Sequence, residues 1–446
     1  MHQTISDLLI LISDSFENRT VHTHKKYLEK TQWLSRKDLE KLQLKKFKAL
    51  LVHAYSRVPH YHECFKEAGF HPADFMTFAD AERIPILDRS TVRTNCHSML
   101  QVGNPSSRDI VNWTTSGTTA APVEFCRGKT DLSWAVAAEL RGYGWAGYRV
   151  GDRVGLVWAY GADRTRHFKF KLEKSLTRMQ LLNVYTMSED SMNKFATKLY
   201  TSRPSFIRGY SGALNIFATY LLCNPQFKIT PRAVFTSAST LLPNYRKTIE
   251  RAFNAKVYDY YGSNEVSHIA AQCGQHPGLH ITEENIYLEI VNDKGQSVSP
   301  GEEGRILVTN LNSYDMPFIR YDIGDLGKIL NDTCSCGRKL ALLKPIGRTY
   351  EYFVNRDGSF TCLKDFETVF EGLPISEFQV VQKSFEEIVV RIVPVEGFTQ
   401  ANSEFIRKNI RFRGSAQINI ELVNSIPPEN SGKVQHVVSE LRSTHS

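Results

Sequence analysis

Between residues 36 and 69, apolar side chains recur at the spacing that places them on one face of an α-helix. Pro59 interrupts this pattern and Gly69 ends it. Proline lacks the amide that a helix interior needs, and glycine commonly follows a last helical turn. The pattern therefore predicts helices in this segment, with a break at Pro59.

From about residue 130 to residue 345, helical and extended patterns alternate. We expect helices at 134–144, 190–202 and 242–254, and strands at 153–160, 233–239 and 256–262. Such alternation is typical of a parallel sheet covered by helices. Ligands of these sheets bind at the carboxyl ends of the strands, where we expect Ser237, Ala238, Ser239 and the segment 260–265.

A different pattern follows in the last third of the chain. Segment 286–298 predicts two strands joined around Asp293, and 304–311 predicts another, which together indicate an antiparallel section. After Gly347 the order is two strands, a helix and a strand. The predicted fold class is therefore α/β: a large N-terminal domain (1–347) with parallel sheet layers plus an antiparallel β section, and a small α+β C-terminal domain (348–446).

Composition limits the class of protein. The chain has 446 residues, 41% of them hydrophobic and 23% charged, with a net charge of +8 from scattered basic residues. The longest early apolar run, Leu8 to Ile12, lies between Asp7 and Asp14 and is too short for a signal peptide or a spanning helix. We expect a cytoplasmic protein with no membrane insertion and no nucleic-acid partner.

The stretch TTSGTTAAP (114–122) is rich in hydroxyl residues. It fits a solvated Ser/Thr turn. It also fits a phosphate cradle, in which Gly117 allows close approach of the backbone and its neighbours Thr115, Ser116, Thr118 and Thr119 donate hydrogen bonds. It is not a Walker A loop, because GxxxxGK[ST] is absent. On these residues alone both interpretations stay open.

Three cysteines are grouped around a histidine. Cys334 and Cys336 form CSCG, and Cys273 precedes His280 by seven positions in CGQHPGLH. Three thiolates and one imidazole suit tetrahedral zinc, and four protein ligands leave no open position, as in structural sites. The alternatives are buried free thiols, or His276 as the fourth ligand.

Several stretches taken in order resemble the adenylate-forming superfamily, in its phenylacetate-CoA ligase and CapK-like branch. The resemblance runs from about Leu39 to Lys433 and includes AYSRVPHYHECFKEAGF, IPILDRSTVRTN, TTSGTTAAP, YDYYGSNE, MPFIRYDIGD, CSCGR, IGRTYE and SGK. It implies a two-step reaction. A carboxylic acid and ATP form an acyl-adenylate, and the acyl group then passes to a small-molecule acceptor, either the thiol of coenzyme A or an amine or sugar hydroxyl.

The resemblance also implies roles for individual residues. Thr115 to Thr119 would hold phosphates, and Lys433 would bridge the carboxylate and the α-phosphate from a mobile C-terminal lid. Asn264 would donate to the α-phosphate and Glu265 would hold Mg²⁺. The remaining nucleotide contacts would come from Ser237, Ala238, Ser239, Asp259, Tyr260, Tyr261, Gly262, Asp325 and Arg348, with Tyr261 on adenine and Asp325 on the ribose.

By the same analogy, two stretches would line the acyl pocket: Trp158, Tyr160 and Gly161, and Tyr210, Ser211 and Gly212. Ala120 and Ala121 depart from the glycine and lysine usual in the phosphate loop, and Asn264 stands where threonine is usual. A nucleotide-binding protein without turnover is therefore a second hypothesis. A zinc-bearing nucleic-acid module is a third, based on CSCG and the positive charge. The acid, the acceptor and the oligomeric state, a homodimer included, stay open.

Overall fold

The computed structural model describes residues 2–102, 109–114, 123–159, 179–275, 278–348, 352–354, 360–362, 369–370, 372–410, 416–427 and 434–441. The chain packs into two compact units. Unit 1 comprises Met1–Asp152 and Tyr258–Pro345, and unit 2 comprises Arg153–Val257 and Ile346–Ser446. This grouping reflects packing. The predicted domains 1–347 and 348–446 concern parts that fold and move separately, and they stay a prediction.

The helices of unit 1 lie mainly in its N-terminal stretch. The predicted helices in 36–69 are confirmed, since one ends at Arg57 and the next begins at Pro59. The first of them starts at Ser35, whose hydroxyl accepts a hydrogen bond from the Asp38 amide at 3.2 Å. The helices of unit 1 are α1 (Gln3–Glu17), α2 (Val21–Thr31), α3 (Arg36–Arg57), α4 (Pro59–Glu67), α5 (Arg89–Asn95) and α6 (Lys129–Trp145), with 3₁₀ turns η1 (Pro72–Asp74) and η2 (Phe78–Arg83).

The strands of unit 1 form a mainly antiparallel sheet in the order β10-β11-β12-β13-β9-β8-β7. A separate antiparallel pair joins β1 and β2. The predicted antiparallel section is therefore confirmed. The strands are β1 (Ile110–Thr114), β2 (Glu124–Gly128), β7 (Lys256–Ser263), β8 (Ser267–Gln272), β9 (Leu279–Ile281), β10 (Ile286–Val291), β11 (Gly304–Asn310), β12 (Tyr321–Ile329) and β13 (Leu342–Arg348).

One strand prediction in this section was wrong. We expected two strands within 286–298, but after β10 the structure has a turn at Gly295 and a single bridge between Val291 and Ser297. Pro300 follows closely and cannot donate to a ladder, and Gly301 has a positive φ of 94°. These two residues end the extended backbone, and β11 supplies the antiparallel partner of β10.

Residues 153–257 of unit 2 contain the predicted parallel sheet, in the order β6-β5-β3-β4. Its strands have the near-continuous apolar character of strands buried on both faces. The elements are β3 (Val154–Trp158), β4 (Gln180–Asn183), η3 (Val184–Thr186), α9 (Glu189–Ser202), β5 (Phe206–Tyr210), α10 (Ser211–Cys223), β6 (Ala233–Ser237) and α11 (Pro243–Phe253).

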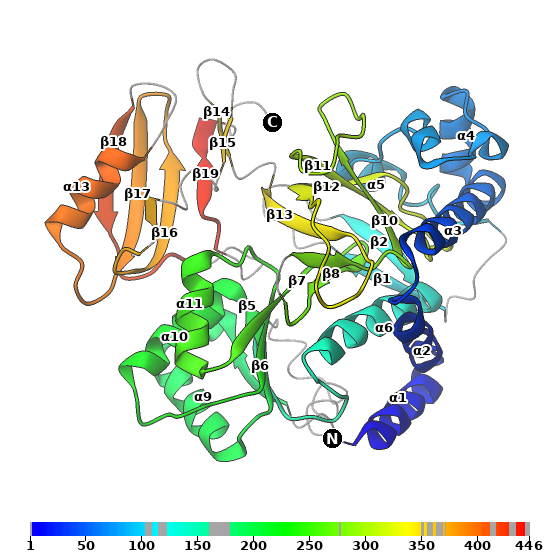
Figure 1. Ribbon diagram of the computed structural model, residues 1–446. Coiled ribbons are helices and arrows are strands. Elements are labelled where there is room, and N and C mark those ends of the chain that lie inside the picture. The colour runs from blue at the N-terminus through cyan, green and yellow to red at the C-terminus, as the bar shows by residue number, and fades with distance from the viewer. Residues whose placement is uncertain are drawn as a thin grey trace. The chain divides into compact units, whose positions relative to one another are not determined.

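The C-terminal part of unit 2 contains the expected two strands, helix and strand as β16, β17, α13 and β18, together with three short strands that the sequence did not indicate, β14, β15 and β19. Its sheet has the order β18-β17-β16-β19, and α13 lies along one face of it (Figure 1). The elements are β14 (Tyr352–Val354), β15 (Phe360–Cys362), β16 (Ile375–Gln382), β17 (Glu387–Pro394), α13 (Gln400–Asn409), β18 (Gln417–Leu422) and β19 (Val437–Ser439).

One apolar core joins the two parts of unit 2. It includes Phe217 on α10, Phe253 on α11 and Val380 on β16, all fully buried. The Asn215 amide donates to the Ser376 carbonyl at 2.8 Å across this junction. Among the helices within the described ranges, none combines the length and the apolar character needed to cross a membrane.

Candidate functional site

The segment YDYYGSNE forms the end of β7 and the turn that leads into β8, and two of its side chains contact β12. The Tyr261 hydroxyl donates to Asp325 Oδ2 at 2.6 Å. The Tyr321 hydroxyl donates to Glu265 Oε1 at 3.0 Å. Tyr321 and Asp325 both belong to β12, on either side of Gly324, whose φ of 75° marks an irregularity in the pairing with β11. The structure thus brings together two stretches that lie about sixty residues apart in the sequence.

Alternation along β7 separates the roles of its two adjacent tyrosines. Tyr260 is buried, and its ring lies 4.5 Å from that of Tyr143 on α6. Tyr261 is half-buried and points toward Asp325, while Asn264 is exposed in the turn. Tyr321 was missed in the sequence, although it lies in the RYDIGD stretch. Burial, and next the nearby Glu265 carboxylate, raise the pKa of Tyr321, which therefore keeps its proton and donates.

In unit 2, the predicted acyl-pocket and nucleotide residues follow three neighbouring parallel strands. Trp158 ends β3, Tyr210 ends β5 and Ser237 ends β6, all at the carboxyl edge of the sheet. The Trp158 and Tyr210 rings lie 4.5 Å apart. The Ser211 and Ser239 hydroxyls are 2.7 Å apart. Ala238 has a positive φ of 71°, and Gly212 lies in the first turn of α10.

Arg208 was another residue that the sequence did not single out. Its guanidinium lies 4.9 Å from the centre of the Trp158 ring. It precedes Tyr210 by two positions on β5. Nothing in the sequence distinguishes it from an ordinary charged residue of a strand.

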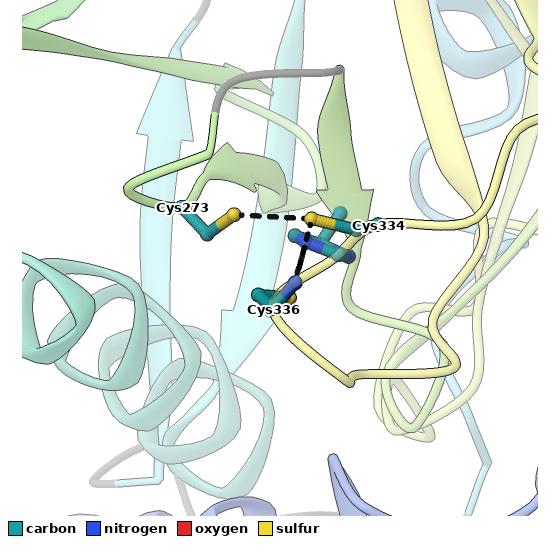
Figure 2. Close-up of side chains that lie close together, drawn as sticks. Cys273, Cys334 and Cys336 are labelled. Atoms are coloured by element: carbon teal, nitrogen blue, oxygen red, sulfur yellow. Dashed lines mark hydrogen bonds between the residues drawn. The ribbon is translucent and has the colours of Figure 1, made fainter.

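The predicted zinc ligands Cys273, His280, Cys334 and Cys336 converge in unit 1, with all four ligand atoms within 4.8 Å of one another. Figure 2 shows Cys273, which directly follows β8, lying close to Cys334 and Cys336 of the β12–β13 loop. The Cys273 and Cys334 sulfurs are 3.5 Å apart, and Cys336 Sγ is 3.4 Å from His280 Nε2. Zinc–sulfur bonds of about 2.3 Å place tetrahedral ligands about 3.8 Å apart, so the spacing fits zinc.

Electrostatics at this cluster also suit a metal. Burial lowers the pKa of His280 to about 4, so its imidazole is neutral. Burial raises the pKa of the Cys334 thiol to about 12, so a thiolate there needs a cation. The amides of Gln275 and Cys336 point at the sulfurs of Cys273 and Cys334, at 3.4 and 3.5 Å. Such outer hydrogen bonds are typical of metal thiolates.

Around the cluster, Arg338 lies between two tryptophans. Its guanidinium is 4.7 Å from the Trp33 ring centre and 4.5 Å from that of Trp145. Gln32 Oε1 accepts from Arg338 Nε at 2.8 Å and from Trp145 Nε1 at 2.9 Å. The Trp145 ring in turn packs edge-on against His280, at 5.5 Å between centroids. These contacts link the cluster to the end of α2.

Several predicted site residues lie outside the described residues: Thr115, Ser116, Gly117, Thr118, Thr119, Tyr160, Gly161, the side chain of Arg348, Lys433, and His276, the alternative ligand. Their roles stay predictions. Within the described ranges, Asp259 lies on β7, where its amide donates to Gln272 Oε1 at 3.0 Å, and Gly262 is exposed near the strand end.

Several known proteins are similar to this chain in sequence or in fold. Residues 353–440 match the CapK C-terminal domain family. The phenylacetate-coenzyme A ligase of Thermus thermophilus is 25% identical over 373 residues, which are 80% of each chain. Protein CapK of Staphylococcus aureus is 22% identical over 458 residues, covering 98% of this chain and 97% of that one.

Among solved structures, 2-hydroxyisobutyryl-CoA ligase in complex with an acyl-adenylate superposes with a TM-score of 0.76. It is 20% identical and covers 93% of this chain and 92% of the other. This similarity confirms the predicted α/β fold with a small C-terminal domain. In sequence and in fold, the chain is therefore similar to acid-CoA ligases and to protein CapK.

Proposed function

We propose that this enzyme joins a carboxylic acid to ATP, releases pyrophosphate, and transfers the acyl group from the resulting adenylate to coenzyme A. The observation that carries the proposal is the pairing of Tyr261 with Asp325 and of Glu265 with Tyr321. This pairing brings an aromatic ring and two carboxylates together in one region of unit 1. The relatives named phenylacetate-coenzyme A ligase support the choice of acceptor. ATP, coenzyme A and reduced thiols such as the free cysteines here are found together in the cytoplasm.

Each residue would contribute a charge or a surface that the nucleotide needs. Asp325 would accept from the two ribose hydroxyls, since a carboxylate has two oxygens for two donors. Tyr261 would stack on adenine while its hydroxyl orients Asp325. Asp259 would accept from the adenine amino group. Glu265 would help to hold Mg²⁺, a hard cation that prefers carboxylate and phosphate oxygens.

Acyl-adenylate formation brings two anions together, so positive charge and donors must be aimed at the transferred phosphate. Thr115 to Thr119 would hold the terminal phosphates and Asn264 the α-phosphate. Lys433 would bridge the acid and the α-phosphate, and Arg348 would reach the ribose. The aromatic side chains at the ends of β3 and β5, Trp158 and Tyr210, would favour an aryl or otherwise apolar acid.

The first test is pyrophosphate release over a panel of aryl and aliphatic acids, with mass spectrometry of products formed with coenzyme A. We expect an acyl-CoA product from at least one apolar acid. In Asp325→Ala, affinities for ATP and AMP should fall together by about a hundredfold, since a charged acceptor of two hydrogen bonds is lost. The matched control Tyr261→Phe keeps the ring and the carboxylate and should lose much less. Unchanged AMP affinity in Asp325→Ala would contradict the assignment.

A second acceptor class has its own support. The S. aureus CapK protein aligns with nearly the whole chain, and the C-terminal segment matches the CapK family. A CapK-like enzyme would pass the acyl group to an amine or a sugar hydroxyl. Product formation with amines or sugars, and none with coenzyme A, would select this function. Nucleotide binding with no pyrophosphate release from any acid would instead indicate a protein without turnover.

We propose that residues 348–446 act as a lid that delivers Lys433 to the first step. Lys433→Ala should then slow adenylation by on the order of 100-fold or more, the size expected for loss of one transition-state charge. Supplied with a preformed acyl-adenylate, the variant should transfer the acyl group at nearly the parent rate. Equal loss in both half-reactions would remove this role.

We propose that Cys273, His280, Cys334 and Cys336 hold a structural zinc ion, supported by their convergence and burial. When bound, the ion would join β8, β9 and the β12–β13 loop. Elemental analysis should find one zinc per chain in the parent and in the control Cys223→Ser, since Cys223 is exposed and lies in unit 2. Cys336→Ser should lose the metal. A parent preparation without zinc would reject the site.

A further inference from the structure

The turn between β7 and β8 contains a strained residue. Ser263 pairs with Ser267 at the end of the hairpin, so Asn264, Glu265 and Val266 form a three-residue turn. Ser267 has a positive φ of 60°. A side chain in this left-handed conformation costs about 1 to 2 kcal/mol, so glycine is the usual residue there. Something in the surrounding structure must therefore hold Ser267 in this conformation.

The opposite strand allows little freedom here. A Cβ atom on Gly262 would lie 2.1 Å from the Ser267 carbonyl oxygen, so only glycine permits this approach of the two backbones. The hairpin therefore has one close-packed geometry at this position. Glu265 leaves the hairpin two residues before Ser267, and its direction depends on that geometry.

A buried arginine contacts the strained serine. Arg127 on β2 is 1% exposed, and its Nη1 donates to the Ser267 hydroxyl. Its Nε donates to Asp131 on α6 at 2.6 Å. Asp131 Oδ1 accepts from Asn310 on β11 at 2.8 Å. Asp131 on α6 thus holds the guanidinium of Arg127, which extends from β2, and Asn310 on β11 holds Asp131. The guanidinium in turn donates to Ser267, the residue of the hairpin with the unfavourable φ.

We propose that Arg127, held by Asp131, is a positioning residue that keeps Ser267 in the left-handed conformation and thereby aims Glu265 at the metal–phosphate region. The inference rests on the proposed function for the role of Glu265. It adds residues that touch neither nucleotide nor metal. A lysine could not replace the arginine, because one ammonium cannot reproduce the planar fork that serves Asp131 and Ser267 together.

The alternative is that the Arg127–Asp131 pair serves only the stability of unit 1. Two substitutions of Ser267 separate these roles and leave the buried ion pair intact. Ser267→Ala removes the hydroxyl but keeps the cost of the positive φ. Ser267→Gly removes the hydroxyl and also the cost, since glycine adopts this φ freely. Only the positioning role predicts that glycine restores what alanine loses.

In pyrophosphate release, Ser267→Ala and Arg127→Lys should each lower kcat about tenfold, the effect of about 1.4 kcal/mol. Both should also need more Mg²⁺ for half-maximal rate, while KM for the acid changes less than about twofold. Ser267→Gly should stay close to the parent in both quantities. The control Ser133→Ala loses a buried hydroxyl of α6 far from the turn in sequence and should leave the Mg²⁺ dependence unchanged. Equal losses in alanine and glycine variants, or none in either, would overturn the proposal.

Amide hydrogen exchange of residues 264–267 gives a readout that needs no activity. Exchange should be faster in Ser267→Ala and Arg127→Lys than in the parent, and should return toward the parent in Ser267→Gly. If the parent releases no pyrophosphate with any acid, the proposed function fails, and the exchange result still decides whether Arg127 orders the turn. The same exchange in the parent and in Arg127→Lys would reject the positioning role.

Discussion

The two units differ in how many charged side chains they bury. Among the residues of unit 1 that the structure describes, three ion pairs have side chains that are at most 3% exposed: Arg127 with Asp131, Arg141 with Glu284, and Arg320 with Glu289. Each arginine also donates to a hydroxyl or a carbonyl on another element, as Arg141 does to the Leu28 carbonyl at 3.1 Å. These pairs connect different elements: β2 with α6, α6 with the turn before β10, and β10 with the turn before β12.

Unit 2 relies on apolar packing. Among the Asp, Glu, Lys and Arg side chains described in this unit, Glu377 is the one that is buried. Its Oε1 atom has no hydrogen-bond partner among the described residues. Burial raises the pKa of Glu377 to about 7, although the Ile426 backbone amide hydrogen-bonds to the carboxyl. The ion pairs described in unit 2, such as Lys194 with Asp190, lie at the surface.

This difference indicates that unit 1 uses buried charge to fix its geometry, whereas unit 2 depends on apolar packing for its stability. Buried ion pairs add little net stability, because desolvation offsets their attraction, but they define geometry strongly when every partner is present. Unit 1 carries the hairpin of Glu265 and the cluster of Cys273, His280, Cys334 and Cys336, where geometry matters. The two parts of unit 2 meet across an apolar core with one ionisable carboxyl, so pH can alter their contact.

The largest effect should come from breaking a pair in unit 1. Arg141→Met leaves Glu284 buried without its guanidinium and should reduce the free energy of unfolding by about 3 to 5 kcal/mol. Urea unfolding followed by hydrogen exchange of β8 and β9 isolates unit 1. The double variant Arg141→Met with Glu284→Leu should recover most of the loss. A single variant as stable as the parent would contradict the comparison.

The next effect concerns Glu377 and depends on pH. With the pKa raised from 4.5 to about 7, the folded chain keeps a proton that the unfolded chain has lost, so stability falls as pH rises from about 4.5 through 7. Glu377→Gln should therefore stabilise unit 2 by about 3 kcal/mol at pH 8 and by almost nothing at pH 4. Burial also raises the pKa of the nearby Tyr245 and lowers that of His436, which packs against the Tyr245 ring. Thermal unfolding across pH, with the exposed Glu421→Gln as control, measures the difference.

A smaller pair of effects compares two buried tyrosines. Tyr61 in unit 1 donates to the Pro317 carbonyl at 2.8 Å and accepts from the Ile319 amide at 3.2 Å. Tyr245 in unit 2 has a buried hydroxyl with no hydrogen-bond partner among the described residues. Tyr61→Phe should cost about 1 to 3 kcal/mol, whereas Tyr245→Phe should be neutral or stabilising. Equal costs, measured by urea unfolding, would show that the hydroxyl of Tyr245 is satisfied.

The smallest effect should come from the surface of unit 2. Lys194→Met breaks the exposed pair with Asp190, four positions away on α9, and should change stability by less than about 0.5 kcal/mol. At high salt, which screens the pair, the variant and the parent should have the same free energy of unfolding. A loss of more than 1 kcal/mol in the same urea assay would mean that surface pairs contribute to unit 2 after all.

The parts predicted correctly from the sequence are those set by local pattern or by a short motif. The break at Pro59, the strands β3 and β6 of the parallel sheet, and the cluster of Cys273, His280, Cys334 and Cys336 all belong here. Cysteine and histidine are the residues that zinc prefers, so even cysteines distant in the sequence could be assigned to one cluster before their positions were known.

The missed parts depend on contacts between distant stretches. Arg127 and Ser267 lie 140 positions apart, and their contact depends on the bulge that sets the β7–β8 register. No local pattern carries that register. Glu377 resembles an outward-facing polar residue of a period-two strand, yet packing around Ile426 buries it. Such tertiary contacts override strand alternation.

The interleaving of the two units has a consequence for synthesis on the ribosome. Unit 1 begins with residues 1–152 but needs 258–345 to be complete, and the first half of unit 2 is made in between. At about 5 to 20 residues per second, adding residues 153–345 takes roughly 10 to 40 s. During that delay Arg141 and Asp131 have been translated, whereas Glu284 and Asn310 have not. The N-terminal helices therefore wait for their buried ion-pair partners during synthesis, and all of unit 1 has been translated before residues 346–446 of unit 2 are made.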